Sequence, residues 1–559
     1  MAHETDRTAS RSRACALWGL TVALGTALVG AGCAKEAQPG LPLVAGPIPV
    51  TSESHPFNGT MWQKVPIDLS DYGYVEQEYY VTGGAHVYDW VPGSNYDLVV
   101  LDPQTGSWLP YEERRRIEPT EYTTRIMVRR PASIEQTSGR VVVEIINMSA
   151  GYDWTAIWGA LWDQLLEQGD VYVGVTSKPN VIPGMIRFDA ERYRRLSMPN
   201  PLPLDVQACG QLPDEPDFDP NLSKLAENGL VWDILTQVGA LLKSDSPDNP
   251  LGRIADRVVL AGESQSADYL ARYIRWFTPR ALLPDGTPVY DAYLAEAGGS
   301  GTNLMYLDEA GGGRTNLMAG LNQCAAELNP LPEDDPQQQI PGRGVPFLIV
   351  HSEWDFPLSD WPPLNFRPSR RRPNADAATD KFMMWEVAGA SHGWTWQYDY
   401  SDAAPEDVVA AGFEPSGFVC GSDQPEINLY MVEKAAYVAL DRWVASGIAP
   451  PSADYLETAA GIPGPVRDQH GNAVGGVRLP EIAVPLATYT GLYVPGPDCT
   501  DAVLPFDQGR VDTLYPEPGD YLGKFETAAQ ALVRDGFLLQ EDALRLIEAA
   551  EQREQARWR

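Results

Sequence analysis

The sequence predicts an α/β protein in which a mostly parallel sheet is flanked by helices. Short apolar runs rich in β-branched residues alternate with longer segments of helical periodicity through the middle of the chain. Parallel strands need long crossover connections, which are usually helices, so this alternation favours a parallel sheet. The 559 residues are 44% hydrophobic and 21% charged, which is ordinary for a globular protein with a sizeable core.

The expected elements follow one another in a regular order. A β-rich region comes first, and the crossover helices begin after it. The expected strands are 96–101, 123–128, 141–146, 171–176, 257–261, 289–295, 346–351 and 383–387, and the expected helices are 155–168, 230–242, 265–277 and 428–445. Two irregular segments rich in Pro and Gly, about 180–228 and 299–343, are expected to be cap-like insertions over the carboxyl edge of the sheet.

The two ends of the chain differ from this middle. Residues 1–32 have a basic start, an uncharged apolar stretch and small residues before Cys33, the layout of a lipoprotein-type signal peptide in which Cys33 is lipidated. Plain secretion and an uncleaved membrane anchor are the alternatives. Residues 33–60 are expected to be a flexible tether and 61–450 the α/β domain, while 451–559 are expected to be a C-terminal extension packed on it.

This start predicts export, either with a lipid anchor in a bacterial cell envelope or by secretion, so the membrane is contacted only through the N-terminal lipid. Four cysteines then lie in an oxidising compartment, and they are either two disulfides of unassigned pairing or free thiols. They are Cys209, Cys324, Cys420 and Cys499.

The charge and the cysteine spacing exclude some classes of partner. The formal net charge of −34 disfavours nucleic acid, because phosphate binding needs a basic surface. No CxxC or Cys/His spacing suggests zinc, and we expect neither a metal nor another cofactor. The oligomeric state is not predicted.

One motif carries the chemistry. An apolar strand, 257–261, is followed by Gly262-Glu263-Ser264-Gln265-Ser266 and then by a helix. A nucleophile on a tight strand-to-helix turn needs small residues on either side, and Ser266 replaces the Gly that usually ends this motif. The turn would expose Ser264 Oγ and aim the backbone N–H of Gln265 at a developing oxyanion. The alternative is a serine that only caps the helix.

A serine nucleophile needs a base and an orienting acid. Of the six histidines, His392 follows the last expected strand of the domain, where this chain order places the base. The acid is expected directly after strand 346–351, where Asp355 is preferred and Glu353 is the alternative.

The neighbours of these residues suggest the rest of a site. The loop after strand 141–146 is expected to supply a second oxyanion donor, the backbone N–H of Met148 or Ser149, unless it is an ordinary turn. Three tryptophans flank the expected acid and base and either line a substrate pocket or pack in the core. They are Trp354, Trp394 and Trp396.

With the order Ser, Asp, His, the chain resembles the α/β-hydrolase superfamily and, more narrowly, a sparsely characterised bacterial α/β-hydrolase-domain family. The resemblance runs from about residue 50 to the C-terminus. It rests on segments 188–193, 232–234 with Gln237, 262–267, 389–393, 442–443, 475–480 and 487–491.

The resemblance implies a serine hydrolase that cleaves small-molecule or polymer carboxylic esters through a Ser-His-Asp triad and an acyl-enzyme intermediate. Acyl transfer or peptide or thioester cleavage by the same triad is an alternative. An alternative of another class is a non-catalytic, surface-binding lipoprotein on a hydrolase scaffold.

Overall fold

The structure is a computed structural model. It describes residues 40–57, 67–90, 97–148, 151–202, 226–299, 339–355, 371–392, 405–413, 427–459, 464–491 and 503–557. Residues 38–559 form one compact unit. The predicted signal peptide and Cys33, in the other unit, lie outside the described residues, as do the four remaining cysteines.

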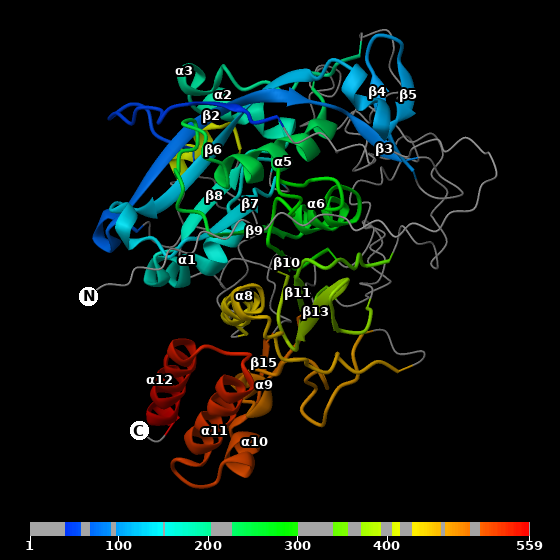
Figure 1. Cartoon of the computed structure of the whole chain (residues 1–559). Helices are drawn as coiled ribbons and strands as arrows, with labels where there is room; N and C mark the ends of the chain where they lie inside the picture. Colours follow the sequence, from blue (N-terminus) through cyan, green and yellow to red (C-terminus); the bar gives the residue numbers. More distant parts are fainter. Residues whose placement is uncertain are drawn as a thin grey trace, which may run out of the picture. The chain divides into compact units, whose positions relative to one another are not determined.

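A ten-stranded sheet forms the centre of this unit (Figure 1). Its strand order is β1-β2-β6-β8-β7-β9-β10-β11-β13-β12. The run from β8 to β13 is parallel, whereas β1, β2 and β6 at one side and β12 at the other pair antiparallel. In sheet order the strands are Leu43–Ala45, Tyr74–Ala85, Thr120–Pro131, Val171–Val175, Arg140–Ile145, Arg257–Glu263, Ala292–Glu296, Phe347–Ser352, Asp380–Val387 and Ala375–Ala377.

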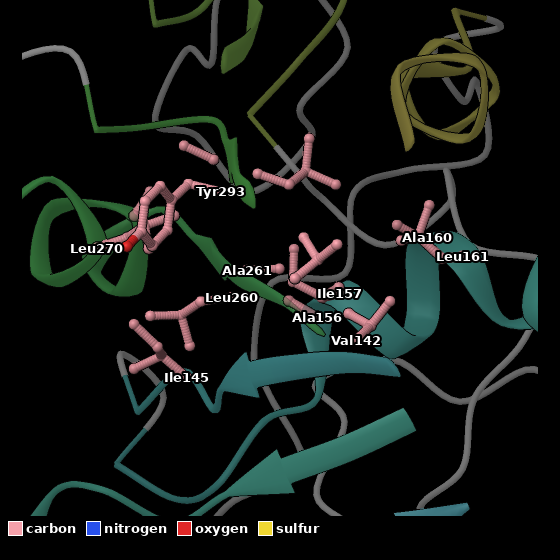
Figure 2. Close-up of a cluster of buried hydrophobic side chains, with 14 of the residues drawn as sticks. Val142, Ile145, Ala156, Ile157, Ala160, Leu161, Leu260, Ala261, Leu270 and Tyr293 are labelled. Carbon is pink, nitrogen blue, oxygen red and sulfur yellow. The ribbon is translucent and has the colours of Figure 1, made fainter. Parts of the chain in front are cut away.

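Helices cover both faces of the parallel strands. Helices α1 (Ala156–Gln168) and α8 (Leu429–Ser446) pack together on one face, and α5 (Val231–Leu242) and α6 (Gln265–Arg272) lie on the other. Alternate strand residues point to opposite faces. Figure 2 shows the consequence: Val142 and Ala261 face the apolar stripe of α1, while Leu260 and Ile145 lie on the side of Leu270 in α6.

The expected α/β order is confirmed, and most boundaries shift by a few residues. The expected helix 265–277 ends as a single π-helical turn, Tyr273–Phe277, after α6. The expected strand 96–101 is β4 (Leu98–Asp102), which belongs to a separate small sheet with β3 (Tyr88–Trp90) and β5 (Ser107–Pro110). The long strand β2 was not expected, because its polar residues and two adjacent glycines hide the alternating pattern.

The prediction of a flexible tether is wrong for residues 40–57. Strand β1 pairs with β2, and the side chain of Phe57 is fully buried. The backbone carbonyl of Phe57 accepts a hydrogen bond from Arg125, and that of Pro49 accepts one from Arg192. Sequence composition hid this because the segment is held by guanidinium groups that lie far away in the chain.

Those guanidinium groups belong to a buried ion cluster, here called the Arg125 network. Its members are Glu78, Arg125, Asp153, Arg192 and Tyr193, which are all at most 3% exposed. Arg125 contacts Glu78 at 2.5 Å and Asp153 at 2.9 Å, and Arg192 contacts the second oxygen of Glu78 at 2.5 Å. Two cations thus meet two carboxylates with hydrogen bonds, the arrangement that buried charges require.

Further elements lie outside the central sheet and its covering helices, and one of them, α7 (Pro405–Ala410), is in neither an expected insertion nor the C-terminal extension. They are α2 (Ile182–Phe188), α3 (Ala190–Tyr193), α7, α9 (Pro480–Ala483), α10 (Gln508–Leu514), α11 (Asp520–Asp535), α12 (Gln540–Arg557) and the pair β14 (Ala487–Tyr489) and β15 (Val503–Pro505). The extension contacts the α/β domain through Lys434, which lies 2.6 Å from Asp542, and through Trp385, whose ring meets that of Phe537. Within the described ranges, every helix is too short or too polar to span a lipid bilayer.

Candidate active site

Ser264 stands on a strained turn between β9 and α6. Its φ of 51° and ψ of −117° are unusual for a residue other than glycine. Two glycines make this turn possible. A Cβ on Gly262 would lie 2.6 Å from the carbonyl oxygen of Ser266, and one on Gly298 would lie 2.6 Å from that of Ser264. Strain held in this way is typical of functional sites.

The three residues predicted as a triad lie in hydrogen-bond contact. Ser264 Oγ is 2.8 Å from His392 Nε2, and His392 Nδ1 is 2.6 Å from Asp355 Oδ1. Because a carboxylate only accepts, Nδ1 carries the proton of neutral His392 and Nε2 accepts from the serine hydroxyl. Burial alone would lower the pKa of His392, but the charge and hydrogen bond of Asp355 outweigh it and raise that pKa above its ordinary value.

Asp355 is held by hydrogen bonds from Ser352, the last residue of strand β11. Its second oxygen, Oδ2, accepts from the backbone N–H of Ser352 at 2.9 Å and from the Ser352 hydroxyl at 2.8 Å. Burial opposes ionisation of Asp355, yet the charge of His392 and these hydrogen bonds lower the pKa of the carboxyl. Asp355 therefore remains the anionic partner of His392.

Glu353, the alternative acid, faces another way. It is fully buried and forms an ion pair with Arg467 at 2.6 Å. Its carboxylate also accepts from the backbone N–H groups of Gly389 at 2.6 Å and Gly491 at 3.4 Å. Glu353 thus ties the loop that leads to His392 to the C-terminal extension. The sequence offered no signal for Arg467, which lies more than a hundred residues away.

Two of the three predicted oxyanion residues, Gln265 and Met148, lie in contact. Gln265 is the first residue of α6, and its side-chain amide contacts the sulfur of Met148 at 3.3 Å. The loop that carries Met148, here called the β7–α1 loop (residues 146–155), is tied to the turn by Asn147. Its Nδ2 donates to the carbonyl oxygen and to a carboxyl oxygen of Glu263, at 3.0 and 2.5 Å. Ser149 lies outside the described residues.

Glu263 is a functional candidate that the sequence reasoning did not single out. The side chain is 1% exposed, and its Oε1 lies 3.9 Å from His392 Nε2. Burial raises the pKa of Glu263 to about 8, so the group is mostly protonated at neutral pH. Its place directly before the nucleophile was visible, but its approach to His392 depends on the turn.

Of the predicted pocket residues, the structure places Trp354 beside the base, with ring centroids 4.5 Å apart. Trp394 and Trp396 lie outside the described residues. No group of three or more His, Cys, Asp or Glu side chains is arranged to hold a metal ion in the part of the chain that the structure describes.

The known proteins that resemble this chain in structure share little sequence with it. A search of curated proteins found no match. Among solved structures, a lipase/esterase from Lactobacillus plantarum is similar at 10% identity with a TM-score of 0.24, over 41% of this chain and 75% of that one. A poly(3-hydroxybutyrate) depolymerase from Bordetella parapertussis is similar at 14% identity with a TM-score of 0.22, over 43% of this chain and 64% of that one.

A family model described as an alpha/beta hydrolase domain matches residues 44–548, which is most of the chain. The match begins within the segment that packs through β1 and ends within α12. Together with the parallel sheet and the strand-turn-helix at Ser264, it establishes that the chain belongs to the alpha/beta hydrolase domain family.

Proposed function

We propose that this protein hydrolyses carboxylic esters, with Ser264 as nucleophile, His392 as base and Asp355 as the residue that orients the base. The observation that carries the proposal is the continuous chain of hydrogen bonds from Ser264 Oγ through His392 to Asp355. A free hydroxyl is a poor nucleophile, and this arrangement supplies the proton acceptor that activates it.

In the first step, Ser264 Oγ bonds to the ester carbonyl carbon while its proton moves to His392 Nε2. The carbonyl oxygen becomes an oxyanion, for which the backbone N–H groups of Gln265 and Met148 are the proposed donors. The intermediate then expels the alcohol, which takes the proton from His392 and leaves an acyl group on Ser264.

In the second step, His392 removes a proton from water, which attacks the acyl carbon. The acid is released and the proton returns to Ser264 Oγ. Asp355 stays ionised throughout and stabilises the imidazolium form of His392, because its lowered pKa disfavours taking up the proton.

The test uses p-nitrophenyl esters of increasing acyl length and a fluorophosphonate probe, with wild type and Ser264→Ala both lacking residues 1–33. We expect hydrolysis and probe labelling in the wild type and neither in the variant. A folded wild type that is not labelled would favour the non-catalytic, surface-binding alternative. Labelling without ester hydrolysis would favour acyl transfer or peptide or thioester cleavage.

We also propose that the chain is exported and lipidated at Cys33. The support is the layout of residues 1–33, with its basic start, apolar stretch and small residues before the cysteine. Metabolic labelling with a fatty-acid analogue tests this. The label is expected on wild type and not on Cys33→Ser, and an unlabelled wild type would contradict lipidation.

A further inference from the structure

A buried lysine links the two chain segments that flank the proposed oxyanion site. Lys178 follows strand β8 and is 2% exposed. Its Nζ donates to the carbonyl oxygen of Ile146 at 2.8 Å and to Ser266 Oγ at 2.6 Å. The same nitrogen lies 4.9 Å from the centre of the Tyr269 ring.

The partners of this lysine are unusual for a buried amine. Within the described residues, the two groups to which Lys178 Nζ donates, a backbone carbonyl and a hydroxyl, are neutral. Burial lowers the pKa of Lys178 to about 7. A neutral amine still has two N–H donors for the two acceptors, so both contacts survive loss of the charge.

The two acceptors adjoin the two proposed oxyanion donors. Ile146 begins the β7–α1 loop, two residues before Met148, and Ser266 directly follows Gln265. Lys178 therefore joins the loop to the turn from a third segment, which follows strand β8. Two direct contacts between loop and turn complement it, from Asn147 to Glu263 and from Gln265 to Met148.

This contact also accounts for a departure from the usual motif. Ser266 stands where glycine normally ends the nucleophile motif, and its side chain is fully buried. Substrate does not reach a hydroxyl in that position, so Ser266 is not a second nucleophile. Its hydroxyl instead gives Lys178 an acceptor on the turn that a glycine would lack.

We propose that Lys178 is a positioning residue that, together with Ser266, holds the backbone N–H groups of Met148 and Gln265 at the separation needed to bind the oxyanion. This inference rests on the proposed function of Ser264. Support of this kind changes the transition state more than the bound ester, because the oxyanion forms only during the reaction.

The experiment compares wild type, Lys178→Met and Ser266→Ala in the full chain. The quantities are kcat, KM and the inhibition constant of a trifluoromethyl ketone, which forms a tetrahedral oxyanion on Ser264. We expect Lys178→Met to lower kcat about 10–100-fold, by analogy with residues that orient metal ligands, with KM within about twofold. Ketone inhibition should weaken by about the same factor as kcat.

Ser266→Ala removes the hydroxyl and leaves the Ile146 carbonyl to hold Lys178. We expect a smaller loss of kcat, about 3–10-fold, and a double variant no worse than Lys178→Met, because both changes break one linkage. This conservative variant keeps the proposal testable even if Lys178→Met does not fold, since full kcat in folded Ser266→Ala would overturn it.

A second buried lysine provides the structural control. Lys434 is 1% exposed and pairs with Asp163 and Asp542 on the other side of the sheet from α6. Lys434→Met should lower thermal stability at least as much as Lys178→Met, while kcat and ketone inhibition of the folded protein stay within about twofold. If Lys178→Met behaves in the same way, Lys178 is a packing residue and the inference is wrong.

The two proposals fail differently. A folded wild type that neither hydrolyses esters nor reacts with fluorophosphonate at Ser264 would overturn the proposed function and this inference with it. A reactive wild type whose kcat and ketone inhibition are unchanged by Lys178→Met would overturn the inference alone.

Discussion

Two buried polar regions of this protein satisfy their charges in opposite ways. In the Arg125 network, cations and carboxylates meet directly, so that Glu78 contacts both Arg125 and Arg192. Around Ser264, Glu263 accepts from the amide of Asn147, and Lys178 donates to a carbonyl and a hydroxyl. Opposite charges stabilise the ionised forms in the first region. Near Ser264, His392 and Asp355 also form such a pair, but the hydrogen-bond partners of Glu263 and Lys178 are neutral.

The pKa shifts of buried groups in the two regions differ in the same way. Burial opposes the charge of Arg125, but the neighbouring Tyr193, Glu78 and Asp153 outweigh it and raise the pKa of the guanidinium. Burial outweighs the neighbouring charges at Glu263 and Lys178, where it raises the pKa of Glu263 to about 8 and lowers that of Lys178 to about 7. Removal of one partner from a buried charge pair destabilises the fold, while groups that titrate near neutrality are typical of sites that perform chemistry.

The largest expected effect is on catalysis, at the proposed nucleophile in the region around Ser264. Ser264→Ala should lower kcat by about 10⁴–10⁶-fold, because no other group then forms the acyl-enzyme. The free energy of unfolding should change by less than about 1 kcal/mol, since the serine side chain makes no cap for α6. Steady-state kinetics and thermal unfolding check both. Retained hydrolysis in the purified variant would place the nucleophile elsewhere.

The next effect compares two carboxylates in one loop. Asp355→Asn should lower kcat about 10³–10⁴-fold, because the amide no longer holds the correct tautomer of His392. Glu353→Gln should instead lower the free energy of unfolding by about 1–3 kcal/mol, because Arg467 loses its charged partner. Its kcat should fall no more than about tenfold. The reverse pattern would make Glu353 the triad acid.

A third substitution breaks the ion network away from the site. Glu78→Gln should lower the free energy of unfolding by about 3–5 kcal/mol, because two buried guanidinium groups lose their shared carboxylate. Chemical denaturation measures this. The exposed Glu121, on the strand that carries Arg125, gives the matched control: Glu121→Gln should change stability by less than about 0.5 kcal/mol. Equal effects of the two variants would contradict the role of the network.

The smallest effect is a shift in pH dependence. Only neutral His392 accepts the serine proton, so kcat/KM should rise with pH through the raised pKa of His392. When Glu263 is ionised, its negative charge helps to raise the pKa of His392. Glu263→Gln should therefore move the acidic limb to lower pH, by roughly 1 unit. A limb that moves to higher pH, or stays in place, would remove Glu263 from the electrostatics of the base.

The predictable parts of the fold are those in which the residue pattern within each element is enough to identify it. Strand β9, the turn at Ser264 and helix α6 follow one another without interruption, so their order and the small residues around the serine are visible in the chain. The alternation of strands and helices was predictable for the same reason. The long strand β2 was not predicted, because it is stabilised by pairing with β6 rather than by a strand-like composition of its own.

The sequence by itself determined the α/β class and the candidate nucleophile, because both depend on neighbours within a few residues. Only the tertiary structure shows that Asp355, and not Glu353, is hydrogen-bonded to His392. The two lie two residues apart, and the difference is made by His392 on one side and by Arg467 and Gly491 on the other. Tertiary structure also turned the expected tether into packed chain and brought Lys178 beside Ser266. Such contacts join segments distant in sequence, where spacing carries no information about approach.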